Sequence, residues 1–551
     1  MPFKTIFTDE MIKEYTEQGF WGKGTFLDHF ERNVERFPDK EYVVDAKGRV
    51  SFSKMSKIVN NIAARLVDFG FKKEDRIAVM LPNWVEFFCM HYAIEKMGAI
   101  LVPLFINLRD RDVEYILKTT ESVGIVIPNY FNKYDYVKMM MDLKKKINSL
   151  KYIFVIGDNV PDGMFSFDQL LVGQTEKKYD EYKFNELRTT DTDVYSMRIT
   201  SGTTARPKIY MYTENGYVNA AYILKERLRL TEGDVMLGIP PISQGIGLWL
   251  GFALPTITGC RVVLQEKFDP IESLDLIEKE RVTVVAVVPT QSIKMLNLPK
   301  LRETDFSSLR VIQHAGALLP YSVAKEVEEK FDCPVLNCFE ASDGPDVCCT
   351  SLDDPPEVRY GTVGKPFAGH EVKIVGMDGR ELGIGQVGEI WSRGPSISGG
   401  YYKEPPQVLE ETFLKDGWFR HGDLGMIRED GNIVIMGRIK DLIIRGGQNI
   451  APKEIEDLLL THPKIKEVAV VGMPDKILGE KCCAFVAPLD LKDPLTFKEM
   501  IDHLEKNKLA RFKFPERLEI IEELPMIGSA KIDKKLLVGW IVDKLEREEV
   551  T

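Results

Sequence analysis

The segment from Thr200 to Lys208 holds side chains suited to binding a phosphate group. Hydroxyl groups and backbone N–H groups donate to phosphate oxygens, and a lysine adds a compact positive charge. Gly202 lets the backbone turn tightly or approach a ligand closely. The composition also suits a Ser/Thr-rich surface turn, and the Walker A pattern G-x-x-x-x-G-K-[ST] occurs nowhere in the chain. The candidate phosphate-binding residues are Thr200, Ser201, Gly202, Thr203, Thr204 and Lys208.

The overall composition is that of an ordinary globular protein. The chain has 551 residues, of which 44% are hydrophobic and 28% are charged, so it can form two to four domains, or one large and one smaller domain. The formal net charge of −11 argues against non-specific nucleic-acid binding. A local basic patch for a phosphate-bearing ligand remains compatible with it.

The cysteines and histidines do not follow metal-binding patterns. The 8 cysteines include no C-x-x-C pair, and the 7 histidines are scattered, which argues against zinc ribbons, thioredoxin chemistry and a histidine metal cluster. We expect reduced, mostly buried thiols in a cytoplasmic protein without a signal peptide. The apolar stretch Ile246–Leu264 contains Pro255 and glycines, and it is predicted as a buried helix and strand rather than a membrane span.

Strand and helix signals alternate in the first part of the chain. Apolar residues recur at helical spacing between Met55 and Val67, with Ser53 in the position of an N-cap. A second helix is predicted over Trp84–Met97. Such alternation favours parallel sheets covered by helices. The predicted buried strands are Arg76–Leu81, Ile100–Leu104, Gly124–Pro128 and Thr283–Val288.

After about Gly361 the pattern changes to shorter elements. Short β-like runs separated by glycines predict a β-rich subdomain, and a charged connection follows at Gly437–Asp441. The segments beyond it predict a separate small α+β domain. The β-like runs are Glu371–Val375, Gly388–Trp391 and Asn432–Met436; the later helices are Pro452–Leu460 and Leu495–Asn507, and the later strands Glu467–Val471 and Cys482–Val486.

Taken in order, these segments resemble the acyl-adenylate-forming superfamily of acyl-CoA synthetases, nonribosomal adenylation domains and luciferases. Thr200–Lys208 looks like that family's phosphate loop, and Ala315-Gly316-Ala317 resembles the strand of small residues that lines its adenine and acyl pocket. Phe339 to Asp343 stands where the family has an aromatic residue, a glycine and a Thr-Glu pair. Phe419 to Asp423 is similar to its ribose-binding segment.

The C-terminal third carries the most specific part of the resemblance. Gly437-Arg438-Ile-Lys440-Asp441 and the following Gly446-Gly447 loop closely match the family's hinge segment. Pro525, then Lys531-Ile-Asp-Lys534, looks like its catalytic-lysine segment. The resemblance covers nearly the whole chain.

The resemblance implies an α/β fold with a large N-terminal domain of helix-covered β-sheets and a small mobile α+β C-terminal domain. We expect the N-terminal adenylate-forming domain to span residues 1–437, with a β-rich subdomain at about 361–437. A hinge at 438–441 precedes a C-terminal lid domain at 442–551.

The implied reaction explains why these residue types are needed. A carboxylate is a poor electrophile and is first activated by attack on the α-phosphate of ATP, which brings two anionic groups together. Lys531, Lys208 and a Mg²⁺ ion held by Asp343 would neutralise that charge. From the residues alone, Lys531 could equally be a solvated lysine of a charged tail, and Asp343 a loop residue beside Gly344.

The resemblance assigns further roles. Asp423 and Arg438 would bind the ribose, although a turn residue and a surface salt bridge are the alternatives, and His421 is interpreted as a packing residue. The small domain would rotate about Lys440 or Asp441, so that Gly446 and Gly447 line a thiol tunnel rather than form an ordinary turn. The remaining predicted contacts are Ala315, Gly316, Ala317, Phe339 and Ser342 to the nucleotide, and Ser243, Gln244 and Gly245 to the acyl group.

Several positions depart from the family pattern. Ala205, Ile209 and Ala530 replace glycines, Glu340 stands where a glycine is usual, and Asp343 replaces a glutamate. The motif that typically carries a pocket histidine reads Pro240-Pro241-Ile-Ser243-Gln244-Gly245. The small residues Gly245, Gly247 and Ala315 are expected to leave room for an aromatic or medium-length acyl group.

The predicted function is that of an AMP-forming acid–thiol ligase. A carboxylic acid and ATP, with Mg²⁺, would give acyl-AMP and pyrophosphate, and the CoA thiol would then give acyl-CoA and AMP. One alternative is an aryl acid–AMP ligase that loads a carrier-protein phosphopantetheine supplied by another chain. A second alternative is a non-catalytic nucleotide-binding relative, suggested by the altered phosphate loop and Asp343.

Overall fold

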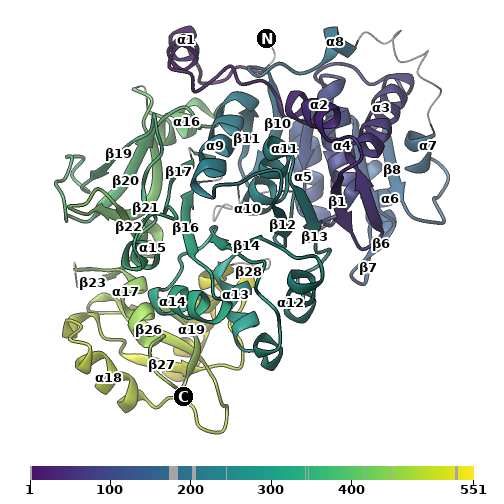
Figure 1. The fold of residues 1–551 in the computed structure, drawn as a ribbon. Coiled ribbons are helices and arrows are strands. Elements are labelled where there is room, and N and C mark those ends of the chain that lie inside the picture. The colour runs from purple at the N-terminus through teal and green to yellow at the C-terminus, as the bar shows by residue number, and fades with distance from the viewer. Residues whose placement is uncertain are drawn as a thin grey trace.

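The computed structural model has a mixed α/β architecture built around two large sheets (Figure 1). This confirms the predicted fold class. The residues it describes are 3–172, 184–200, 207–243, 245–341, 343–344, 346–414, 416–446, 448–527 and 531–550.

The first large sheet has seven strands and is parallel except at one edge, where β10 and β11 pair antiparallel. Its strands are short, apolar and mostly buried on both faces, as expected for a parallel sheet covered by helices. In spatial order they are β11 (Ile209–Thr213), β10 (Val194–Ile199), β4 (Ile100–Pro103), β3 (Arg76–Val79), β5 (Gly124–Pro128), β8 (Tyr152–Ile156) and β9 (Phe165–Ser166).

The second large sheet has nine strands with a parallel centre and antiparallel edges. In spatial order they are β18 (Lys365–Pro366), β17 (Asp346–Cys349), β16 (Val335–Glu340), β15 (Val311–His314), β14 (Val284–Val287), β12 (Val235–Gly238), β13 (Arg261–Leu264), β1 (Glu41–Asp45) and β2 (Gly48–Ser51).

One continuous apolar core joins the two sheets. It contains residues of both sheets together with helices α2, α3, α4, α9 and α11, and every residue of α4 except Glu86 is buried. Helices α12, α13 and α14 cover the outer face of the nine-stranded sheet, and α5 and α6 cover that of the seven-stranded sheet. The bounds are α2 (Phe26–Arg36), α3 (Phe52–Asp68), α4 (Val85–Lys96), α5 (Asp110–Thr120), α6 (Tyr136–Lys144), α9 (Glu214–Arg227), α11 (Leu254–Thr258), α12 (Pro270–Lys279), α13 (Pro289–Leu296) and α14 (Tyr321–Phe331).

Short helices connect the elements of this part of the chain. The stretch Ile246–Leu264 forms α10, a π-helix at Trp249–Ala253, α11 and β13, which confirms the predicted buried helix and strand. The remaining helices are α1 (Asp9–Glu17), α7 (Asp168–Leu171), α8 (Phe184–Leu187), α10 (Gly245–Leu248), α15 (Pro356–Gly361) and α16 (Pro406–Thr412); the strands of a small hairpin are β6 (Tyr130–Phe131) and β7 (Tyr134–Asp135).

The structure corrects one helix boundary. Helix α3 begins at Phe52, and its N-cap is Ser51 rather than Ser53. Ser51 has an extended backbone, and its Oγ accepts a hydrogen bond from the N–H of Lys54 at 3.3 Å. An N-cap must lie outside the helix in this way, whereas Ser53 is already within the first turn.

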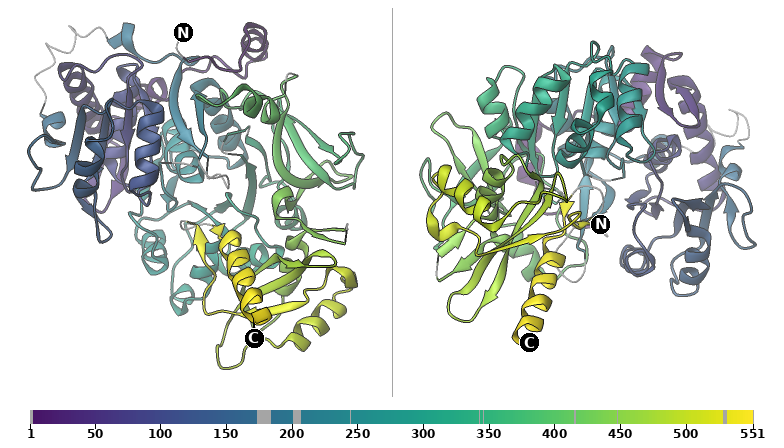
Figure 2. Two further views of the ribbon diagram at one scale, coloured as in Figure 1. Left: turned by 180° about the vertical axis from the view of Figure 1, so that it is seen from behind. Right: turned by 90° about the horizontal axis from the view of Figure 1, so that it is seen from below.

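Two further sheets follow. The antiparallel sheet β19 (Glu371–Val375), β20 (Gly388–Arg393), β21 (Phe419–Ile427) and β22 (Ile433–Arg438) lies beside the nine-stranded sheet. The last sheet contains β24 (Gln448–Ile450), β23 (Ile443–Arg445), β26 (Gly479–Pro488), β25 (Ile465–Asp475) and β27 (Arg517–Ile520), and it packs with α17 (Pro452–Leu459), α18 (Phe497–Lys506) and α19 (Lys534–Val550). Figure 2 shows this C-terminal unit below the rest of the chain. The domain boundaries given above stay a prediction.

All eight cysteines are free, and seven of them are buried. This confirms the expectation of mostly buried thiols. Within the described ranges, no helix has both the length and the apolarity needed to cross a bilayer.

Two buried carboxyl groups hold the N-terminus of α2. Glu95 of α4 accepts a hydrogen bond from the N–H of Leu27 at 2.8 Å, and Glu214 of α9 accepts one from the N–H of Phe26 at 2.5 Å. Both glutamates are almost completely buried. Burial raises the pKa of Glu95 to about 7, and burial and then the charge of Glu95 raise the pKa of Glu214 well above its usual value. Burial therefore favours the protonated form of both carboxyl groups.

The raised pKa of Glu95 makes the stability of the fold depend on pH. Because the pKa of Glu95 is raised from 4.5 to about 7 in the folded state, its stabilising effect is complete below pH 4.5 and is lost as the pH rises through 7. We expect the free energy of unfolding to fall by about 3 kcal/mol over this window in urea titrations at a series of pH values. Glu95→Gln should flatten that slope, and the control Glu114→Gln, at a partly exposed position, should keep it. An equal slope in Glu95→Gln would contradict the raised pKa of Glu95.

Candidate active site

The predicted phosphate loop connects β10 and β11 at the edge of the seven-stranded sheet. The N–H of Thr200 donates to the carbonyl of Lys208 at 2.9 Å, and the N–H of Lys208 donates to Thr200 Oγ1 at 3.1 Å. The two ends of the loop are therefore fastened together on buried strands. Ser201, Gly202, Thr203 and Thr204 lie outside the described residues, as do Gln244, Ser342 and Gly447.

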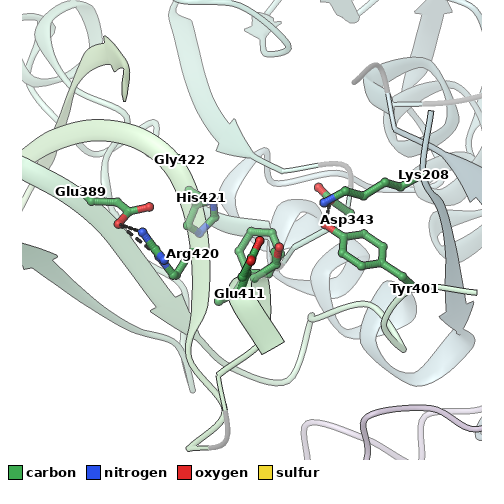
Figure 3. A pocket seen from close by; sticks show the side chains of 10 residues that line it. Lys208, Asp343, Glu389, Tyr401, Glu411, Arg420, His421 and Gly422 are labelled. Carbon is green, nitrogen blue, oxygen red and sulfur yellow. Dashed lines mark hydrogen bonds and ion pairs between the residues drawn. The ribbon is translucent and has the colours of Figure 1, made fainter. Parts of the chain in front are cut away.

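Tyr401 connects Lys208 to Asp343 (Figure 3). The Tyr401 hydroxyl donates to Asp343 Oδ2 at 2.6 Å, and Lys208 Nζ lies 4.5 Å from the centre of the Tyr401 ring, within the range of a cation–π contact. The chain around Tyr401 is itself held on β11, because Met211 N donates to Gly400 O at 2.9 Å and Tyr402 N donates to Ile209 O at 2.7 Å. One strand thus positions both the lysine and the tyrosine.

Opposing effects act on the pKa of the Asp343 carboxyl group. Burial raises its pKa, while the Tyr401 hydrogen bond and the positive charges of Lys208 and Arg438 lower it. The Ser398 hydroxyl also donates to the Asp343 backbone carbonyl at 2.5 Å, which fixes the backbone at this position. A partly buried carboxylate with one oxygen held by a donor and cations nearby is poised to exchange those partners for a ligand.

A pocket of about 370 Å³ opens beside these side chains. It brings together two predicted site residues, Lys208 and Asp343, with part of the predicted ribose-binding segment. Sequence reasoning missed Tyr401, Glu389 and Glu411, which carry no spacing signal because they approach from separate connections and strands. The lining consists of Lys208, Asp343, Glu389, Tyr401, Glu411, Thr412, Phe419, Arg420, His421 and Gly422.

His421 is a pocket residue as well as a packing residue. Its ring lies 5.0 Å from that of Phe339 and 4.9 Å from that of Phe419, and Nε2 is 2.6 Å from the Ser392 hydroxyl. Burial lowers the pKa of His421 to about 3, so the ring is neutral. Its contacts are those of a neutral aromatic group that supports Phe339, a predicted nucleotide contact.

Asp423 and Arg438 form an ion pair on neighbouring strands. They are register partners of β21 and β22, and Arg438 Nε lies 3.2 Å from Asp423 Oδ1. Asp423 is buried, whereas the Arg438 side chain is 43% exposed. Asp423 directly follows the residues Phe419 to Gly422 of β21 that line the pocket. The role of the pair in ribose binding stays a prediction.

The structure corrects two expectations about small residues. Ala315-Gly316-Ala317 is not a strand, because β15 ends at His314 and Gly316 has a φ of +78°, as in a tight turn. Gly247 does not leave room for a ligand, because a Cβ there would lie 2.1 Å from the Pro241 carbonyl oxygen. The backbone itself fills that space.

Ser243 and Gly245 lie at the start of α10. Ser243 is 1% exposed, and its hydroxyl has no hydrogen-bond partner within the described part of the chain. Gly245 has a φ of +56°, and the space next to its Cα is open. A buried hydroxyl without a partner commonly faces a water or ligand site, so this arrangement is compatible with the predicted acyl pocket.

The predicted hinge residues Lys440 and Asp441 lie in a short 3₁₀ helix, Ile439–Asp441, which joins β22 to β23. Gly446 follows β23 with a φ of +55°. Lys531 begins β29 (Lys531–Ile532), which pairs with β28 (Met526–Ile527). In Figures 1 and 2 this hairpin lies on the side of the C-terminal unit that faces the large sheets.

Family comparisons agree with the geometry. The model described as "AMP-binding enzyme" matches residues 30–402, and the model described as "AMP-binding enzyme C-terminal domain" matches residues 454–531. The first match includes Lys208, Asp343, Glu389 and Tyr401 of the pocket, and the second includes β25, β26 and β27 of the C-terminal sheet.

Two curated relatives align over nearly the whole chain. A medium-chain fatty-acid–CoA ligase of Escherichia coli (strain K12) is 31% identical over 550 residues, covering 100% of this chain and 96% of the relative. A 2,3-dihydroxybenzoate-AMP ligase of Bacillus subtilis (strain 168) is 30% identical over 543 residues, covering 98% of each. The solved structure of ATP-bound MatB from Rhodopseudomonas palustris has a TM-score of 0.82 and 26% identity, covering 93% of this chain and 98% of that one.

The close packing at Gly247 gives a stability prediction. Gly247→Ala places a methyl group against the Pro241 carbonyl, so we expect a loss of about 1–3 kcal/mol of unfolding free energy from overpacking. Thermal unfolding followed by circular dichroism measures it. Gly383→Ala is the matched control, because the atom nearest to a Cβ at that position, Gln386 Oε1, is 3.9 Å away. Equal stability of the two variants would show that the α10 backbone is not held against Pro241.

Proposed function

The chain belongs to the AMP-binding enzyme family, and from this premise we propose which of its residues carry the reaction, what metal they use and which acids they accept. The activity is that of an AMP-forming acid–thiol ligase. A carboxylic acid and ATP give acyl-AMP and pyrophosphate, and the CoA thiol then gives acyl-CoA and AMP.

We propose that the pocket shared by Lys208, Tyr401 and Asp343 is the phosphate and metal end of the ATP site. The observation that carries this proposal is the joining of the phosphate-loop lysine to Asp343 through one tyrosine. Lys208 would neutralise phosphate charge, and Lys531 would reach the same reacting groups from the β28–β29 hairpin. Electrostatic stabilisation of this kind supplies much of the rate of phosphoryl and adenylyl transfer.

The donor set of the pocket fits Mg²⁺. This ion prefers oxygen ligands and is commonly held by one or two carboxylates together with substrate phosphates. Asp343 and Glu411 both line the pocket and offer carboxylate oxygens. Asp343 would hold the ion and Glu411 could assist, and the bound ion would offset negative charge on the ATP phosphates.

The other predicted contacts complete the proposal. Phe339 would stack on the adenine, supported by the neutral His421 ring, and Asp423 would accept hydrogen bonds from the ribose with Arg438 donating alongside. Ser243 and Gly245 would line the acid pocket. After adenylation, the small domain would turn about Lys440 or Asp441 and bring Gly446 to the thiol path.

The acid is proposed to be an aromatic or medium-length carboxylic acid. The two curated relatives described above act, by their names, on a medium-chain fatty acid and on 2,3-dihydroxybenzoate. The second of these supports the alternative in which the acyl group is loaded onto a carrier-protein phosphopantetheine. The buried Ser243 hydroxyl, which has no hydrogen-bond partner among the described residues, favours an acid with a hydroxyl or amino substituent over a plain alkyl chain.

Pyrophosphate release across a panel of aliphatic and hydroxylated aromatic acids, with and without CoA, tests the proposal. Release followed by formation of an acyl-CoA supports the ligase. Release without any CoA product would favour the carrier-protein route. No release with any acid would favour a non-catalytic nucleotide-binding relative.

The bond from Tyr401 to Asp343 gives a prediction for the metal. Tyr401→Phe removes a hydrogen bond to a charged group, worth about 1.5–3 kcal/mol, and it raises the pKa of Asp343 further because that bond lowers it. We expect kcat/KM for pyrophosphate release to fall about tenfold or more, with a higher Mg²⁺ requirement and an acidic limb displaced to higher pH. Tyr402→Phe is the control, because the Tyr402 ring packs against Phe3. An unchanged pH profile in Tyr401→Phe would argue against this role.

The proposed hinge separates the two half-reactions. Asp441→Pro restricts the backbone of the connection between β22 and β23, so we expect slower thioester formation with adenylation largely retained. Single-turnover assays of acyl-AMP and acyl-CoA formation measure each step. Lys531→Ala is the complementary variant and should lose adenylation while ATP binding persists. Equal losses of both steps in Asp441→Pro would count against a hinge.

A further inference from the structure

Cys338 and Cys349 face each other across two antiparallel strands. They are direct register partners of β16 and β17. The adjoining pair is joined by Thr350 N donating to Asn337 O at 3.0 Å, so the cysteines occupy the next position, which lacks backbone hydrogen bonds. At such positions the Cα atoms approach to about 4.5 Å, which lies within the range that a disulfide bridges.

The two sulfur atoms also point to the same side of the sheet. Gln313 Nε2 donates to Cys338 Sγ at 3.0 Å, and Cys349 Sγ lies 3.6 Å from Gln313 Oε1, to which its thiol donates. Gln313 is completely buried, so its amide holds both sulfurs in place. By contrast, the sequence neighbours Cys348 and Cys349 belong to different core clusters and lie on opposite faces.

The two cysteines differ in their exposure to solvent. Cys338 is partly exposed, whereas Cys349 is buried. Glu340 follows Cys338 on the same partly exposed face of β16, since alternate residues of a strand share a face. A small reagent can therefore reach the Cys338 sulfur first.

We propose that Cys338 and Cys349 form a site of reversible oxidative modification, at which a peroxide oxidises the two thiols to a disulfide and thereby lowers the affinity of the nucleotide site for ATP. The effect on the nucleotide site rests on the proposed function, whereas formation of the disulfide does not. Nothing in the established activity of the family uses these two side chains.

The oxidation balances as a two-electron reaction. The Cys338 sulfur attacks a peroxide oxygen, giving a sulfenic acid and releasing water, or an alcohol from an organic peroxide. The Cys349 sulfur then displaces the hydroxyl group of the sulfenic acid, forming the S–S bond and a second molecule of water. Each thiol contributes one proton and one electron to the reduced peroxide. A dithiol reductant reverses the reaction by thiol–disulfide exchange.

The protein environment of Cys338 slows the oxidation of the two thiols when the peroxide concentration is low. Burial raises the pKa of the Cys338 thiol well above its usual value. Because the thiolate is the reactive form, the reaction is slow at low peroxide concentration. The pair would thus respond to a sustained excess of peroxide.

The disulfide would act on the nucleotide site through its position. It closes a loop of chain that contains Phe339 and Asp343, the predicted nucleotide and metal contacts. It also removes the Cys349 thiol donor and leaves the buried Gln313 carbonyl without that partner, which is unfavourable. Relaxation of β16 and β17 would displace Phe339 and Asp343, and displacements of about 1 Å can cost about a hundredfold in rate.

The test uses the full chain with hydrogen peroxide as the probe. Free thiols are alkylated after treatment, and peptide mass mapping identifies disulfide-linked segments. Calorimetric titration with ATP and Mg²⁺ follows the nucleotide site without any acid. We expect a Cys338–Cys349 link, a fall of about tenfold or more in ATP affinity, and recovery of affinity after reduction with dithiothreitol.

Matched variants separate this site from general oxidation. Cys338→Ser and Cys349→Ser should keep their ATP affinity in peroxide, and Cys333→Ser, which alters a buried cysteine of another core cluster, should respond like the original chain. The alanine variants at 338 and 349 replace the serine variants if those do not fold.

Two results would overturn the proposal. One is the absence of the Cys338–Cys349 link at peroxide levels that oxidise other thiols of the chain. The other is a linked protein that binds ATP as the reduced one does, or an equal loss of ATP affinity in Cys349→Ser. Failure of the reduced protein to release pyrophosphate with any acid would instead count against the proposed function, since the link and ATP binding are measured without acid.

Discussion

The hydrogen bond from Tyr401 to Asp343 is the contact that unites the candidate site. It ties a carboxylate from the connection between β16 and β17 to the chain segment that runs along β11, and the same tyrosine ring underlies the Lys208 ammonium group. These three residues come from distant parts of the sequence and from both large sheets. Because an enclosed carboxylate is unfavourable without a donor or a cation, the tyrosine also stabilises the arrangement before any ligand arrives.

The two large sheets explain why the residues of the candidate site can be rigidly positioned and still accessible to a ligand. Their shared core fixes β10, β11, β15 and β16, while the connections that follow these strands carry Lys208, Gly316 and Asp343. A rigid scaffold with functional residues on its connections is a common arrangement in α/β enzymes. The four-stranded sheet then brings His421 and Asp423 to the same place, and the C-terminal unit follows through one short 3₁₀ helix.

Much of the scaffold could be predicted from the sequence because buried parallel strands are continuous apolar runs. Gly124–Pro128 has the predicted bounds, and Thr283–Val288 differs by one residue at each end. The antiparallel, partly exposed strand Glu371–Val375 also has the predicted bounds. The resemblance located Lys208 and Asp343, which the structure brings to one pocket. Their neighbours Tyr401 and Glu411 could not be found, because contact between distant segments leaves no local pattern. Gly247 was misinterpreted since a missing side chain indicates free space only where no backbone fills it.

The cap on α2 has a consequence for how the chain folds as it is made. The first backbone N–H groups of this early helix are satisfied by side chains of α4 and α9, and the latter lies nearly 190 positions further along the sequence. Contacts of such long sequence separation form late and slow the folding of the whole domain. During synthesis the emerging N-terminal segment therefore keeps an incompletely satisfied helix end until α9 has left the ribosome. The seven-stranded half cannot mature as an independent early unit, and its dependence on later segments makes the large domain fold as one body.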